Sequence, residues 1–81
     1  MSDYIATFHT HLSAMRSARS LKGRAETVAL SPVPRALSSS CGTCVRYTAE
    51  DTLLEAMDVD LESIALSLGN EKYQVIYRAV E

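Results

Sequence analysis

Two cysteines separated by two residues, Cys41-Gly42-Thr43-Cys44, are the side chains of this 81-residue sequence best suited to chemistry. A thiolate is a nucleophile, a metal ligand and a redox group, so this spacing permits sulfur transfer, metal binding or disulfide exchange. Two cysteines are too few for the disulfide framework of a small secreted domain. The pair therefore favours reactive or metal-binding thiols in an intracellular, cytoplasmic protein.

The residues around Cys41 are typical of a polar loop. Three serines lie directly before it: Ser38, Ser39 and Ser40. Gly42 permits a tight backbone whose N–H groups can turn toward the sulfur, and Arg35 or Arg46 would further favour the thiolate. We expect Cys41 to attack an activated sulfur and hold it as a persulfide, with Cys44 as a resolving thiol.

Two histidines, His9 and His11, offer a different use for the same cysteines. In the sulfur-transfer interpretation either histidine assists proton transfer. Together with Cys41 and Cys44 they would instead provide four tetrahedral zinc ligands, which makes a metal-binding module the alternative. A third option is a protein-interaction domain, including a homodimer, that uses an open sheet face or exposed apolar groups.

The first half of the chain predicts the elements that position these residues. Alternation over residues 4–9 indicates a strand, and apolar spacing from residue 10 indicates a helix that ends at Gly23. Residues 25–30 read as a second strand, closed by Pro32 and Pro34, and residues 45–49 as a third. The cysteines thus lie on a long loop before the third strand.

The second half predicts a helix and a final strand. Apolar residues at positions 54, 57, 61, 64 and 68 have helical spacing, which indicates either one long helix or a turn followed by a shorter helix over residues 60–68. Residues 73–80 resemble a strand. The resulting order is β-α-β-β-α-β, which is the ferredoxin-like α+β sandwich. We therefore expect one domain over residues 1–81, with two helices on one face of a four-stranded antiparallel sheet. Parallel first and second strands would bring residues 9–11 close to the cysteine loop.

Charge and composition argue against several classes of function. Residues 1–49 contain six basic and two acidic side chains, which gives a net charge of +4. Residues 50–81 contain two basic and eight acidic side chains, which gives a net charge of −6. A sequence pI near 5.6 argues against general nucleic-acid binding. No apolar run reaches the ~18 residues of a membrane span. No acid/base pair or cofactor loop accompanies the thiol, so we expect a non-enzymatic carrier without a cofactor.

Three segments of the sequence together resemble a known family. They are residues 4–9 (YIATFH), residues 32–42 (PVPRALSSSCG) and residues 45–47 (VRY). This pattern is similar to the selenium/sulfur carrier protein-like family of short bacterial proteins, and Cys41 matches its motif cysteine. The resemblance implies a carrier that exchanges sulfur or selenium with a donor or acceptor protein. Cys44 lies outside the family motif, so its resolving role rests on this sequence alone.

Overall fold

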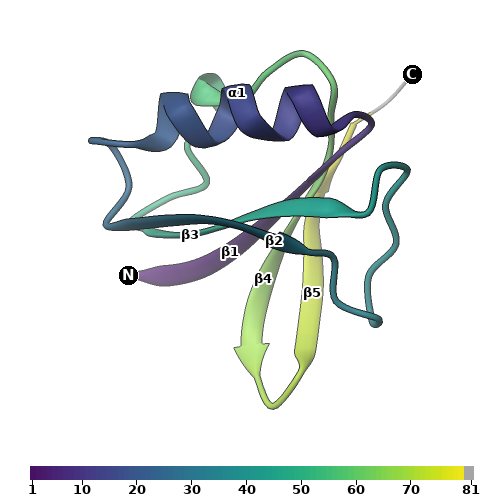
Figure 1. The fold of residues 1–81 in the computed structure, drawn as a ribbon. Coiled ribbons are helices and arrows are strands. Elements are labelled where there is room, and N and C mark those ends of the chain that lie inside the picture. The colour runs from purple at the N-terminus through teal and green to yellow at the C-terminus, as the bar shows by residue number, and fades with distance from the viewer. Residues whose placement is uncertain (80–81) are drawn as a thin grey trace.

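The computed structural model describes residues 1–79, which form one antiparallel sheet with a helix across one face (Figure 1). The strands pair in the order β2-β3-β1-β4-β5. In chain order the elements are β1 (Ser2–Phe8), α1 (His11–Leu21), β2 (Thr27–Pro32), β3 (Thr43–Ala49), the short 3₁₀ helix η1 (Leu54–Ala56), β4 (Leu61–Gly69) and β5 (Lys72–Arg78).

The ferredoxin-like prediction, with four strands and two helices, is wrong. The described residues contain five strands and one α-helix, because the segment predicted as a second helix forms η1 and β4 instead. The predicted last strand corresponds to β5, which pairs with β4 as a hairpin. Its predicted end at Val80 lies outside the described residues.

A β-bulge explains why β4 has helical spacing in the sequence. Phe8 pairs with Leu61 but Thr7 pairs with Ser63, so β4 contains one extra residue at this point. Leu61 and Ile64 therefore lie on the same face although they are three residues apart, as they would in a helix. Pairing with β1 and β5 outweighs the local preference for a helix.

The core lies between α1 and the sheet. Helix α1 begins after Thr10, whose hydroxyl accepts a 3.1 Å hydrogen bond from the N–H of Ser13. Its small buried residues let the helix approach the sheet closely. Leu21 of the helix and four residues of the sheet, Phe8, Val45, Tyr47 and Ile64, are the largest fully buried side chains of this core. Among residues 1–79 no helix has the length and hydropathy that a membrane crossing requires.

The strand directions bring the predicted site residues to one end of the sheet. Both β1 and β2 run antiparallel to β3, so they are parallel to each other. The start of α1 therefore lies at the same end as the loop that joins β2 to β3, on the right of Figure 1. The predicted proximity of residues 9–11 to this loop is confirmed by the contacts described below.

Candidate functional site

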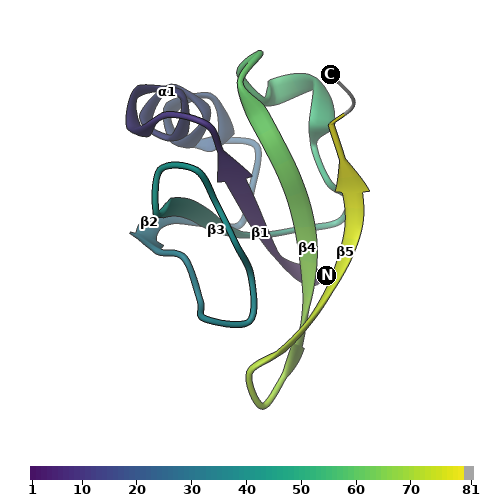
Figure 2. The same ribbon diagram turned by 90° about the vertical axis from the view of Figure 1, so that its right-hand side faces the viewer.

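The cysteine loop, residues 33–42, faces the viewer in Figure 2 and is closed by backbone hydrogen bonds. The N–H of Val33 donates to the carbonyl of Gly42 at 3.1 Å, and the N–H of Leu37 donates to the carbonyl of Pro34 at 3.0 Å. Gly42 has a φ of +75°, a conformation that favours glycine. The backbone therefore turns sharply between the two cysteines, as the sequence indicated.

Cys41 lies in this turn and is partly exposed. Its thiol donates a long hydrogen bond of 3.5 Å to the backbone carbonyl of Thr43. A thiol in this position is accessible from solvent and is held by a contact that a small movement can release. It is thus placed to react with another molecule.

Cys44 is fully buried in β3, on the face of the sheet opposite α1. Its Sγ lies 3.3 Å from the hydroxyl of Ser31 and donates to the carbonyl of Pro32 at 3.6 Å. Burial raises the pKa of the Cys44 thiol, and this effect exceeds the lowering by Ser31 and Arg46. Cys44 is therefore a protected thiol, and the two cysteines are chemically unequal.

Of the two arginines predicted to favour the Cys41 thiolate, Arg46 contacts Ser31 and Arg35 is exposed. Nε of Arg46 donates to the hydroxyl of Ser31 at 3.0 Å, which links Arg46 to Cys44 through Ser31. Arg35 is exposed on the turn that begins at Pro34. The structure thus brings Arg46 to the buried cysteine and leaves Arg35 at the surface of the loop.

Two of the three serines fasten the loop to the sheet, whereas Ser38 is exposed. The hydroxyl of Ser39 donates to the carbonyl of Phe8 at 3.1 Å. Ser40 is held by a carboxylate of β4: its hydroxyl donates to Oε2 of Glu62 at 2.8 Å and its N–H to Oε1 at 3.3 Å. Ser39 and Ser40 therefore hold the loop in position.

Glu62 is the residue of this site that sequence reasoning missed. Partial burial raises its pKa, but hydrogen bonds from Ser40 and Ser39 and the charge of His9 outweigh this effect and hold the pKa below its ordinary value. Glu62 lies at the bulge of β4, beside the end of β1. A strand prediction for residues 61–69 would have placed it next to the loop.

The two histidines contact residues on either side of Cys41. Nδ1 of His9 lies 3.3 Å from the hydroxyl of Ser40 and 3.6 Å from Oε2 of Glu62. Nδ1 of His11 lies 3.2 Å from the hydroxyl of Thr43. Within residues 1–79, no three or more His, Cys, Asp or Glu side chains are grouped so that they could hold a metal ion. The histidines thus contact hydroxyl groups of the loop, and no arrangement here favours the metal-binding alternative.

Comparison with known proteins gives one match. A family model described as "Putative Se/S carrier protein-like" matches residues 3–66. The matched range extends from β1 into β4 and includes the cysteine loop, both histidines and Glu62. Searches of curated proteins and of solved structures return no match.

Proposed function

The chain belongs to the Se/S carrier protein-like family, and on this premise we propose that Cys41 carries sulfur or selenium between partner proteins. The observation that carries the proposal is the contrast between the two thiols. Cys41 is partly exposed on a loop fastened at Ser39 and Ser40, whereas Cys44 is buried. A carrier needs one accessible thiol that is positioned and yet able to reach a partner.

The transfer step is a thiol–persulfide exchange. The Cys41 thiolate attacks the outer sulfur of a persulfide on the donor protein, the donor's S–S bond breaks, and the donor leaves as a thiolate. Cys41 then holds the persulfide, and no net oxidation occurs. We assign His11, which contacts Thr43, to accept the proton that the Cys41 thiol loses. Attack by an acceptor thiolate on the outer sulfur completes delivery in the reducing cytoplasm.

Burial of Cys44 protects the loaded state in this proposal. A resolving attack would join Cys44 Sγ to Cys41 Sγ, break the bond to the outer sulfur and release hydrosulfide. The resulting disulfide would then need two electrons from an external dithiol. Because Cys44 is buried and its pKa is raised, little thiolate is available for this attack. Release by Cys44 therefore requires the loop to lift from the sheet.

Loading with labelled sulfur tests the proposal. The protein is incubated with a cysteine desulfurase and ³⁵S-cysteine, then separated without reductant. We expect the wild type and Cys44→Ala to take up label and Cys41→Ala to take up almost none. Circular dichroism of both variants establishes that each is folded. Uptake by folded Cys41→Ala at the wild-type level would refute the carrier role.

A further inference from the structure

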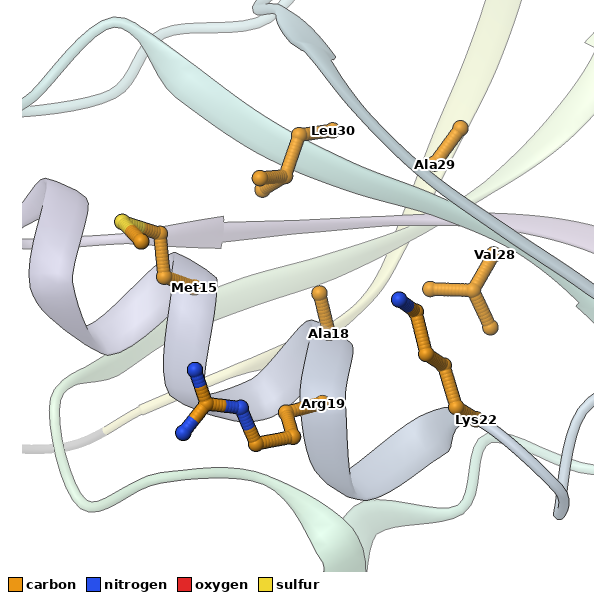
Figure 3. A pocket seen from close by; sticks show the side chains of 7 residues that line it. All are labelled: Met15, Ala18, Arg19, Lys22, Val28, Ala29 and Leu30. Atoms are coloured by element: carbon orange, nitrogen blue, oxygen red, sulfur yellow. The ribbon is translucent and has the colours of Figure 1, made fainter.

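An apolar groove runs between α1 and the edge strand β2 (Figure 3). Met15 and Ala18 of the helix face Val28 and Leu30 of the strand across a hollow of about 280 Å³. Met15 is 41 % exposed and Leu30 is 43 % exposed, although both belong to regular elements. Large apolar side chains that share one groove are typical of a docking surface.

The backbone of β2 is available along this groove. β2 is the end strand of the sheet and pairs only with β3. The N–H of Val33 donates to Gly42, so the backbone groups of Val33 point toward the chain of β3. In an antiparallel pair this direction alternates along the strand. The N–H and C=O groups of Val28 and Leu30 therefore point away from β3, to the open edge of the sheet. An extended segment could pair with these groups as an added strand.

The positive charge beside the groove indicates which side chains a segment paired with β2 should carry. Arg19 and Lys22 of α1 line the groove, and among residues 1–79 no carboxylate lines it. Arg19, Lys22 and the apolar floor all line the α1 side of β2. An extended segment complements them when the side chains on its own α1 side, at every second position, include both acidic and apolar residues. Two copies paired through β2 would bring their arginines and lysines together, so like charges oppose a second copy of this chain as the occupant.

We propose that the α1–β2 groove docks an extended acidic segment of a partner protein as a sixth strand of the sheet. β2 ends at Pro32, directly before the cysteine loop, so a segment docked along β2 leads toward Cys41. As a partner site for sulfur transfer, the inference rests on the proposed function. The docking itself depends only on the groove, the free strand edge and the two cations.

Binding of a synthetic peptide tests the docking. The probe is a fluorescein-labelled peptide of about nine residues, a typical strand length, in which glutamate and valine take turns at every second position and threonine stands between them, so that both kinds of side chain face α1. The matched peptide has lysine in place of glutamate. Fluorescence anisotropy should show binding of the acidic peptide only. The double substitution Arg19→Glu, Lys22→Glu should weaken binding about tenfold or more, because two attractive contacts become repulsive. Arg16→Glu, on a different flank of the same helix, should change it less than about twofold.

Amide hydrogen exchange of the wild-type complex tests the added strand. The amides of Val28 and Leu30 should exchange more slowly when the acidic peptide is bound, because they acquire acceptors. Equal binding of the basic peptide, unchanged exchange at both amides, or an equal loss with Arg16→Glu would overturn the proposal. So would a β2-mediated dimer in sedimentation.

Peptide binding and sulfur uptake, both measured on the same variants, distinguish this inference from the proposed function. Cys41→Ala should bind the peptide as the wild type does, and the Arg19, Lys22 variant should still take up sulfur from a small-molecule persulfide donor. Absence of peptide binding by the wild type, with normal sulfur uptake, would overturn the groove alone. Normal peptide binding with sulfur uptake that persists in Cys41→Ala would overturn the carrier role alone.

Discussion

The hydroxyl of Ser40 donates a 2.8 Å hydrogen bond to Oε2 of Glu62, and this contact joins the cysteine loop to β4. A second bond from the Ser40 N–H to the same carboxylate makes the contact bidentate. One carboxylate therefore holds the residue that precedes Cys41. We therefore expect this contact to restrain the loop beside Cys41.

Glu62→Gln should loosen the loop, because the uncharged amide accepts weaker hydrogen bonds from Ser40. We expect a loss of about 1 kcal/mol in unfolding free energy and faster reaction of Cys41 with iodoacetamide. Urea denaturation and the alkylation rate measure the two effects. Glu71→Gln, in the exposed β4–β5 turn, is the control and should change neither. An unaltered alkylation rate in Glu62→Gln would show that Glu62 does not restrain the loop.

The lowered pKa of Glu62 predicts a pH dependence. Because the folded pKa lies below the ordinary value of 4.5, the ionised carboxylate stabilises the folded state. That contribution is fully present above pH 4.5 and is lost as the pH falls through the lowered pKa. The stability difference between wild type and Glu62→Gln should therefore shrink on acidification, as urea denaturation at pH 7 and near pH 3 can measure. A difference that stays constant would contradict the ionic contact.

Cys44 should resist modification in the folded protein. Its thiol is buried and its pKa is raised, so both access and thiolate content are low. Iodoacetamide should alkylate Cys41 at least about tenfold faster than Cys44, with both modified in denaturant. Mass spectrometry of the native and denatured reactions counts the adducts. Equal rates at the two cysteines in the native protein would contradict the protection of Cys44.

The hydroxyls of Thr7 and Ser63 test the register of β4. They lie 2.6 Å apart in the buried layer opposite α1, a contact that depends on the bulge between Leu61 and Ser63. Thr7→Val should leave the Ser63 hydroxyl buried without its partner and lower stability by about 1–3 kcal/mol. Adding Ser63→Ala should recover a large part of this loss. Purely additive losses in the double variant would indicate a different register.

The sequence predicts the first half of the fold well and the second half poorly. Residues 4–49 have clear alternation, helical apolar spacing that ends at Gly23, and prolines that close a strand, and these local signals correspond to β1, α1, β2 and β3. Residues 61–68 have helix-forming composition, and the bulge makes the spacing of Leu61 and Ile64 helical. The strand there depends on pairing with β1, which is distant in the sequence. Local periodicity could not predict it.

The candidate site, too, was predicted from the sequence in one part and not in another. The loop, its turn at Gly42 and the approach of both histidines follow from the order of the first three strands and are confirmed. The sequence could not identify Glu62 as a site residue, because the predicted second helix placed it outside the sheet. The family match over residues 3–66 confirms the resemblance carried by the motif around Cys41. The roles of Cys41 and its neighbours in transfer stay predictions.

The most direct test of the carrier role is the mass of the protein after loading by a sulfur donor, recorded without reductant. We predict a gain of about 32 mass units for one sulfur atom as a persulfide. Trypsin should release residues 36–46 as one peptide with both cysteines, and its fragmentation should place the added sulfur on Cys41. Sulfur located on Cys44, or no gain in mass under conditions that load a known sulfur carrier, would contradict the account.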